Sequence, residues 1–144
     1  MQSSDSLDVR RCVCANIRRT DRAITQFYEA ILAPSGLHMT QFTLLATIAE
    51  AAPIPLTRLA DLLVMDRTTL TRNLGPLTRE GRVSIEMGED RRTRLVTLTE
   101  AGEQVLAQAL PLWRQAQTHM QQALGQSRLE RLLNELSTVI TLSQ

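Results

Sequence analysis

Apolar residues recur at helical spacing along most of the chain. In residues 8–34 they fall three, four or seven positions apart, and the Pro and Gly of APSGL at 33–37 end the run. Further helices are expected at 41–51, capped by Thr40, at 58–64, capped by Thr57, and at 67–80, capped by Asp66 and terminated by Gly81. A tight turn at 64–66 separates the last two. This order predicts a helix-turn-helix, in which the second helix is the recognition helix.

After Gly81 the pattern changes from helical to alternating. VSIEM at 83–87 and RLVTLT at 94–99 place apolar residues at every second position, and GEDRRT between them has the composition of a turn. The segment is therefore a predicted β-hairpin, the wing of a winged helix-turn-helix. Thr99 is expected to cap a long helix, with a kink at Pro111, and Gly125 separates it from a last helix. The predicted fold is mainly α with one small β-hairpin wing, flanked by N- and C-terminal helices.

The recognition helix divides into two faces on a helical wheel. Three leucines form one apolar stripe that faces the core: Leu70, Leu74 and Leu77. The opposite face and its flanks carry short polar side chains, arginines and a glycine: Thr68, Thr69, Thr71, Arg72, Gly75 and Arg79. Arginine can reach the acceptors of guanine, and the threonine methyl can contact thymine, so this face is suited to the major groove. The alternative is a solvated helix face with no ligand.

Arginines also crowd the predicted hairpin, at Arg91, Arg92 and Arg94. On a narrow ribbon such side chains can enter a minor groove or bind phosphate, which adds affinity more than sequence information. Asp90 is unexpected beside DNA. We interpret it as an acceptor for a hydrogen bond from Arg92 that fixes the direction of that residue. A turn aspartate among solvated arginines is the alternative.

Composition limits the function classes. The 144 residues are 43% hydrophobic, as in a globular domain, and the formal net charge is +1. All sixteen basic residues are arginines, and residues 57–94 hold eight of them against six acids. No apolar run is long enough to cross a membrane and the first residues lack a signal-peptide pattern, so a cytoplasmic location is expected. We find no phosphate loop, no metal-ligand spacing and no nucleophile-base pair, so neither an enzyme nor a cofactor nor a metal is expected.

The block LTRLADLLVMDRTTLTRNLGPLTREGRVSIEMGEDRRTRLVTLTEAGEQVL resembles the MarR family of bacterial winged helix-turn-helix transcription regulators. The resemblance implies one domain over 1–144. Its dimerisation helices would cover about 8–34 and 99–142, and its DNA-binding region about 38–98. It implies a homodimer on a pseudo-palindromic operator, most often as a repressor released by a signal. By resemblance, Arg92 is the wing arginine and Asp90 is its partner, which orients the wing. The full set of predicted DNA contacts is Arg67, Thr68, Thr69, Thr71, Arg72, Arg79, Arg91, Arg92 and Arg94. LGPL at 74–77 departs from the family pattern, and a bend is expected there.

The signal that acts on such a regulator has two candidate forms. By resemblance, a small apolar or phenolic effector would bind between the dimerisation helices and the winged region, near residues that are otherwise core or interface: Trp113, Phe27, Phe42, Tyr28, Met39 and His38. The second form is thiol oxidation. Cys14 precedes Tyr28 by fourteen residues, which resembles the spacing in organic-hydroperoxide sensors of the family, although Arg18 replaces a second tyrosine. Fourteen residues span about 21 Å of helix, so the two can meet only across a dimer.

The two cysteines allow further alternatives. Each can be a structural thiol, or one can be activated by the nearby Arg11, Arg18 and Arg19. On a helix Cys12 and Cys14 would point about 200° apart, which disfavours their pairing with each other or their joint binding of a metal. A different class of function also stays open, a winged-helix dimer that binds protein instead of DNA. The arginines on the recognition face argue against it, because protein-binding faces more often carry apolar anchors.

Overall fold

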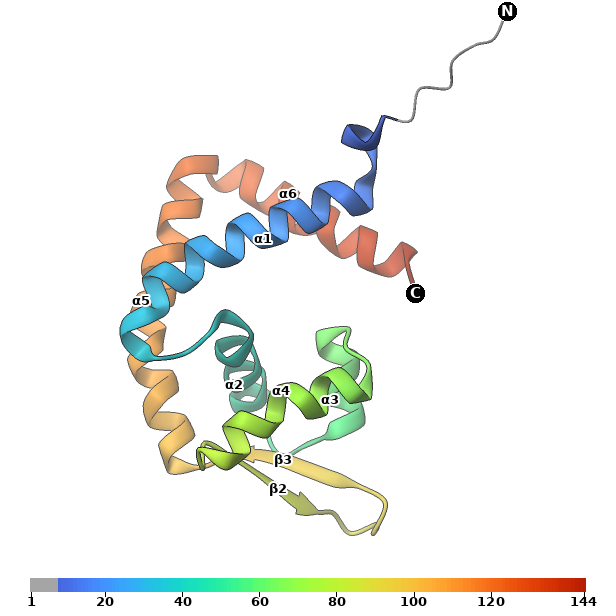
Figure 1. The fold of residues 1–144 in the computed structure, drawn as a ribbon, viewed down its shortest axis with the longest axis vertical. Helices are drawn as coiled ribbons and strands as arrows, with labels where there is room; N and C mark the ends of the chain where they lie inside the picture. The colour runs from blue at the N-terminus through green and yellow to red at the C-terminus, as the bar shows by residue number, and fades with distance from the viewer. Residues whose placement is uncertain (1–7) are drawn as a thin grey trace, which may run out of the picture.

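The structure is a computed structural model, and it describes residues 8–144. Three long helices, α1 (Val13–Leu32), α5 (Glu100–Leu124) and α6 (Gln126–Leu142), frame one end and one side of the molecule (Figure 1). Two short 3-10 turns, η1 (Val9–Arg11) and η2 (Ala33–Ser35), precede and follow α1. Helices α2 (Met39–Ala51), α3 (Leu56–Leu63) and α4 (Arg67–Arg79) lie with a small sheet at the other end. The expectation of a mainly helical fold with a small wing is confirmed.

The helix-turn-helix is formed by α3 and α4. Between them Val64 adopts a left-handed conformation with φ +53°, and Asp66 caps α4 by accepting a hydrogen bond from the Thr69 backbone N–H at 2.7 Å. Two other predicted caps are wrong. Helix α2 begins after His38, whose backbone N–H donates to Gln41 Oε1 at 3.0 Å. Helix α3 begins directly after Pro55. Thr40 and Thr57 therefore lie inside the first turns.

The sheet has three strands, one more than the hairpin that the sequence predicts. Strands β2 (Val83–Met87) and β3 (Arg94–Leu98) form the antiparallel hairpin, and β1 (Ile54–Pro55) pairs with the other side of β3, in the order β1-β3-β2. Ile54 lies opposite Val96, and both side chains are buried. A proline is tolerated in β1 because an edge strand leaves one row of its N–H groups unpaired.

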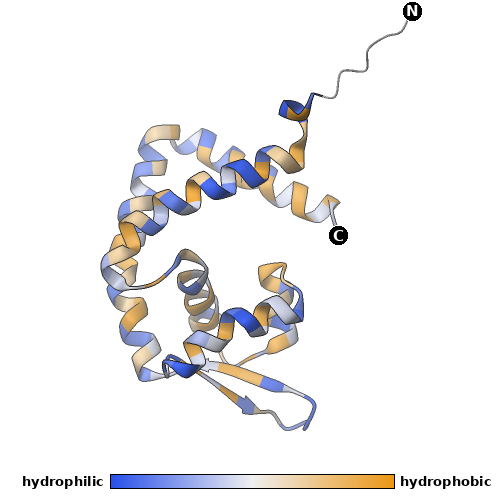
Figure 2. Ribbon diagram, in the orientation of Figure 1, coloured by the Kyte–Doolittle hydropathy of each residue, from blue (hydrophilic) through white to orange (hydrophobic). Residues whose placement is uncertain are grey.

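One hydrophobic core joins the helices to the sheet. The leucines of α4 pack with α2, with the strand residues Val83 and Val96, and with the first half of α5. Helix α6 has no buried residue, and apolar positions recur along it (Figure 2). Helix α5 continues through Pro111, and Gly125 separates it from α6 as predicted. Over residues 8–144, no helix combines the length and apolar character that a membrane span requires.

Candidate DNA-binding surface

The recognition helix α4 is held by its leucine stripe. Leu70, Leu74 and Leu77 are completely or almost completely buried. The side chains of the opposite face are exposed, which the wheel predicted: Arg67, Thr68, Thr71, Arg72 and Arg79. The burial of three leucines fixes the rotation of the helix about its axis. The arginines and threonines consequently form one outward surface.

Thr69 differs from the other predicted contact residues because it is half-buried and bound to the helix cap. Its backbone N–H donates to Asp66 Oδ1 and its hydroxyl donates to Asp66 Oδ2 at 3.1 Å. The backbone hydrogen bond, followed by the hydroxyl bond, lowers the pKa of the Asp66 carboxyl below its ordinary value. Thr69 therefore serves the start of the helix, and its hydroxyl hydrogen is already in use.

The Gly75–Pro76 pair does not end α4, which stays helical to Arg79. Glycine at this position makes room for an arginine. A Cβ atom added to Gly75 would lie 3.3 Å from Nη1 of Arg79, so that guanidinium folds back over the glycine. Gly75 belongs to the face that the wheel predicts to point outward, and its observed neighbour there is the Arg79 side chain. The consequence is a defined position for one of the predicted contact arginines.

The wing loop, residues 88–93, is ordered by Asp90. The Asp90 carboxylate accepts a hydrogen bond from the backbone N–H of Arg92 at 3.0 Å, and its carbonyl accepts one from Thr93. This bond comes from the Arg92 backbone, so the charge-assisted contact predicted between the Arg92 guanidinium and Asp90 is not the one observed. Between residues 8 and 144 no ion pair joins the two side chains. Within the described part of the chain, neither Arg91 nor Arg92 makes an ion pair, so both guanidinium groups are available to a partner.

Arg94 differs from its two neighbours in the wing. It lies at the start of β3, and its guanidinium donates to the carbonyl of Arg91 at 2.9 Å. Arg94 thus braces the loop that presents the other two arginines. All three side chains are nevertheless exposed.

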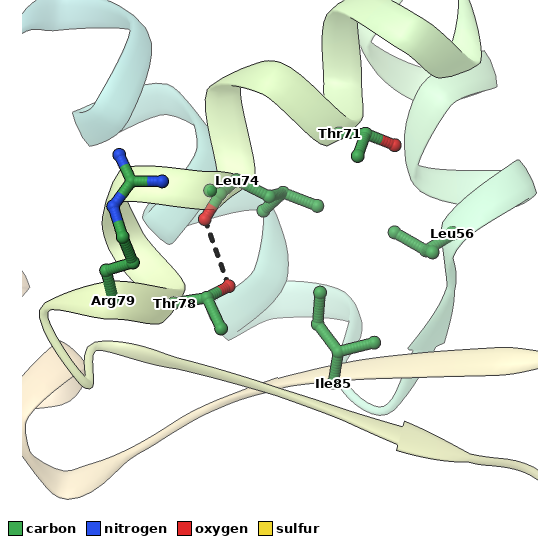
Figure 3. A pocket seen from close by; sticks show the side chains of 7 residues that line it. Leu56, Thr71, Leu74, Thr78, Arg79 and Ile85 are labelled. Carbon is green, nitrogen blue, oxygen red and sulfur yellow. Dashed lines mark hydrogen bonds between the residues drawn. The ribbon is translucent and has the colours of Figure 1, made fainter.

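A groove of about 320 Å³ separates the recognition helix from the wing. It is lined by Thr71, Leu74 and Thr78 on α4 and by Ile85 on β2, and Arg79 stands at one side (Figure 3). In a winged helix-turn-helix, the helix and the wing enter neighbouring grooves of DNA, so the sugar-phosphate strand between those grooves faces this region. Ile85 and Thr78 were not among the residues predicted from the sequence. The alternation of apolar residues in VSIEM predicts on which face of β2 the Ile85 side chain lies, but not how far this face is from α4.

The far end of the recognition helix is fastened to the start of α5. The Thr99 hydroxyl donates to the Gly81 carbonyl, the Thr99 backbone N–H donates to the Arg82 carbonyl at 3.2 Å, and Gly102 N–H donates to the same Thr99 hydroxyl. A Cβ atom on Gly102 would lie 2.0 Å from the Arg82 carbonyl oxygen. These hydrogen bonds and the close approach of Gly102 connect α5 to the segment between α4 and the wing, and we call them together the α5 joint. Thr99 and Gly102 both belong to the LTEAG segment that the sequence singled out, but their contact with Arg82 can be found only in the structure.

The thiol residues are not assembled into a site within one chain. Both cysteines are exposed, and Cys12 lies just before α1 with extended backbone, so the helical angle assumed between it and Cys14 does not apply. Tyr28 is buried and donates from its hydroxyl to Gln117 Oε1 at 2.7 Å, and burial raises its pKa. Cys14 and Tyr28 lie near opposite ends of α1. Any pairing between them requires a second chain.

The six residues suggested for an effector pocket are distributed over several environments. Phe42 is buried and stacks on Trp113 with ring centroids 5.8 Å apart. Phe27 packs against Tyr28 and against the His119 ring. His38 precedes α2, and Met39 lines a cavity between α1, α2 and the turn before α4. The aromatic residues are therefore packing groups.

The fold and the exposed arginine surface define a winged helix-turn-helix protein. A model of the MarR family matches residues 37–93. The HTH-type transcriptional regulator YwoH of Bacillus subtilis (strain 168) is 30% identical over 95 residues, 66% of this chain and 69% of the relative. The chain belongs to the MarR family.

Two solved structures are similar over almost their whole length. The transcriptional regulator MosR of M. tuberculosis, in complex with DNA, is 36% identical, with a TM-score of 0.81 and coverage of 92% of this chain and 98% of that one. A mutant MarR from E. coli, complexed with operator DNA, is 25% identical, with a TM-score of 0.82 and coverage of 94% and 99%. The resemblance drawn from the sequence is confirmed, and membership of a family of transcription regulators agrees with the prediction of a non-enzyme.

Proposed function

We propose that the chain is a transcription regulator that binds a pseudo-palindromic operator as a homodimer and represses until a signal releases it. The observation that carries the proposal is the exposed threonine and arginine face of α4 beside the exposed arginines of the wing. The leucine stripe turns this face outward. The similar MosR structure contains DNA, and the similar MarR mutant contains operator DNA.

The contact residues fall into two groups. On α4, Arg72 reads a base edge through its bidentate guanidinium, with Arg67, Thr68, Thr69, Thr71 and Arg79 around it. On the wing, Arg91, Arg92 and Arg94 neutralise phosphate or enter the minor groove. Asp90 orders the wing through the backbone of Arg92. The winged DNA-binding part covers about 38–98, and the dimerisation parts cover about 8–34 and 99–142.

The dimer proposal is supported by uncovered apolar surface at both ends of the chain. Large apolar side chains of η1, α1 and α6 are more than a third exposed in the single chain: Val9, Val13, Ile17, Leu132, Leu133, Leu136, Ile140 and Leu142. Isolated exposed apolar residues are common, but a row along one helix indicates an interface. A second copy offers the same row, so the contact is closed by a twofold axis.

The test is selection of genomic fragments by the purified protein, followed by affinity measurements as salt is raised. Contacts to 6–10 phosphates predict a loss of about 10³–10⁵ in affinity between roughly 50 and 200 mM salt. Arg92→Ala should reduce the salt slope by about one, whereas Arg114→Ala, an exposed arginine on α5, should leave it unchanged. Absence of binding at low salt would contradict the operator proposal and favour a partner protein.

Oxidation is a second candidate for the releasing signal, beside a small apolar or phenolic effector. Cys14 is exposed and lies in the first turn of α1, where an oxidant can reach its sulfur. In the dimer form of this proposal, Cys14 of one protomer approaches Tyr28 of its partner. Hydroperoxide should release the operator from the parent protein but not from Cys14→Ser. Equal release from both proteins would remove Cys14 from the mechanism.

A further inference from the structure

A cavity of about 240 Å³ lies between α1, α2 and the turn that leads into the recognition helix. One side is polar and carries Asp21 and Thr25 from α1 with Thr40 and Thr43 from α2. The remaining lining is apolar and consists of Met39 and Leu44 from α2 with Leu63 and Met65 from the helix-turn-helix. A ligand here touches a helix of the proposed dimerisation part and the residue just before Asp66, the cap of α4.

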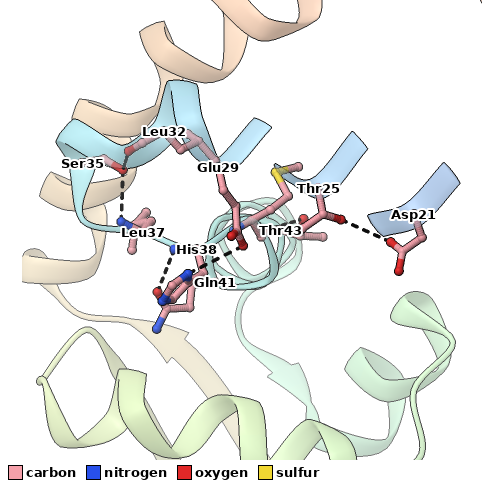
Figure 4. A network of polar contacts seen from close by, with 10 residues as sticks. Asp21, Thr25, Glu29, Leu32, Ser35, Leu37, His38, Gln41 and Thr43 are labelled. Atoms are coloured by element: carbon pink, nitrogen blue, oxygen red, sulfur yellow. Dashed lines mark hydrogen bonds and ion pairs between the residues drawn. The ribbon is translucent and has the colours of Figure 1, made fainter. Parts of the chain in front are cut away.

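The polar side presents hydrogen-bond acceptors. The Thr25 hydroxyl donates to Asp21 Oδ1 at 3.3 Å, and the Thr43 hydroxyl donates to the Met39 carbonyl at 3.0 Å (Figure 4). A hydroxyl has one hydrogen, so both threonines have only lone pairs left for a ligand. An ionised carboxylate is also an acceptor only. The side chain of Thr40 alone keeps a choice between donating and accepting.

The charge of the cavity is negative. Asp21 is the one charged residue that lines it, and it makes no ion pair within residues 8–144. Glu29 lies two turns further along α1 but is already used, because it accepts a hydrogen bond from Met39 N–H at 3.2 Å and lies 3.6 Å from His38 Nδ1. Glu29 thereby occupies the positive end of α2, where an anion would otherwise bind. Arg18, one turn before Asp21, does not line the cavity.

We propose that this cavity binds an organic cation with an apolar body, such as an aryl amidinium or an alkyl ammonium. The cationic head donates to Asp21 and to the lone pairs of Thr25 and Thr43, and the body packs on Leu63 and Met65. The assignment deepens the proposed function and rests on it, since it names the chemical class of an effector. It differs from the small apolar or phenolic effector implied by the resemblance, because a phenolate or carboxylate in this cavity would face Asp21 and acceptor atoms.

Binding at this position is coupled to the operator through Met65. This residue lies at the cavity wall, accepts a hydrogen bond on its sulfur from the Asn73 amide of α4 at 3.8 Å, and directly precedes the α4 cap. A ligand that binds best when the separation of α1 and α4 differs from that in the operator complex lowers operator affinity. By linkage, the operator lowers the affinity for the ligand by the same factor.

Three probes of nearly the same shape test the charge assignment: benzamidine, benzamide and benzoate. Titration calorimetry on the full chain should show benzamidine binding at least about tenfold more tightly than the other two, which is the usual size of a charge-assisted contact. Asp21→Asn should lower benzamidine affinity by at least about tenfold at an unchanged unfolding temperature. Glu50→Gln, which neutralises an exposed carboxylate of α2 outside the cavity, should leave it unchanged.

Equal or tighter binding of benzoate, no benzamidine binding at millimolar concentration, or full affinity in Asp21→Asn would each overturn the proposal. Operator affinity is measured separately, with and without saturating benzamidine. A protein that binds benzamidine through Asp21 but no DNA would refute the proposed function and leave the cation site intact. A protein that binds its operator but not benzamidine would do the reverse. Operator affinity unchanged by bound benzamidine would overturn the coupling.

Discussion

The two helical glycines Gly102 and Gly75 should respond in opposite directions to the same substitution, alanine. In an ordinary helix, Gly→Ala is stabilising because alanine loses less backbone entropy on folding. At Gly102 the added Cβ would lie 2.0 Å from the Arg82 carbonyl oxygen, whereas ordinary contact begins at 3.4 Å. The clash is with backbone, so it can be relieved only by moving α5 away from the segment after α4.

That movement has a calculable cost. Overpacking of this kind costs about 1–3 kcal/mol. Separating the α5 joint also weakens the hydrogen bonds of Thr99 to Gly81 and to Arg82, at about 1 kcal/mol each. The helix propensity of alanine returns up to about 1 kcal/mol. We expect Gly102→Ala to lower the free energy of unfolding by about 2–4 kcal/mol.

Gly75→Ala is the matched control within the recognition helix. Its Cβ would meet only the flexible end of Arg79 at 3.3 Å, so the arginine can move aside. We expect a gain of about 0.5–1 kcal/mol in the free energy of unfolding. Displacement of Arg79 should at the same time weaken operator binding. A more stable protein with lower affinity is therefore the expected phenotype.

Urea unfolding at one fixed protein concentration measures both variants, since association of a dimer makes apparent stability depend on concentration. A Gly102→Ala protein as stable as the parent would refute the close approach of α5 to Arg82. A Gly75→Ala protein less stable than the parent would show that Arg79 cannot leave its position over the glycine.

Three further predictions concern the interface, the helix cap and the signal. Leu136→Glu should shift the protein toward monomer in sedimentation and remove operator binding; a variant that stays dimeric would contradict the role of α6. The lowered pKa of Asp66 stabilises the fold above its ordinary pKa, and this contribution is lost as pH falls through the lowered value. Asp66→Asn should thus have a lower free energy of unfolding than the parent at neutral pH, and the difference between the two proteins should shrink in acid. A difference that does not change with pH would exclude the Asp66 charge as its cause. Parent and Cys14→Ser should differ in hydroperoxide-driven release, measured by fluorescence anisotropy of labelled operator; equal curves would exclude that thiol.

The sequence predicted the elements whose signals are local. The leucine period of α4, the Asp66 cap and the alternation of the wing each lie within a few neighbouring residues, and all three are confirmed. Strand β1 was missed because two residues with a proline carry no period, and their pairing with β3 depends on residues forty positions away in the chain. The caps of α2 and α3 were misplaced because a threonine in a first turn has the same local signature as one at the cap.

The candidate site, like the fold, was predicted only where its signals are local in the sequence. Helical periodicity gave the outward face of α4, but it could not show that Arg79 folds over Gly75 or that Asp90 binds the backbone of Arg92. Those contacts depend on side-chain directions. The cavity beside Asp21 draws its lining from three segments of the chain and has no motif.

We propose that α4 reads bases while the wing adds affinity that does not depend on sequence. The direct test is the affinity of the parent, Arg72→Ala and Arg92→Ala proteins for one selected operator and for the same duplex with single base changes. Arg72→Ala should lose about 1–3 kcal/mol on the operator and lose discrimination at one position in each half-site. Arg92→Ala should weaken all duplexes by the same factor. Unchanged base discrimination in Arg72→Ala, or operator affinity equal to the parent in Arg92→Ala, would contradict these roles of α4 and the wing.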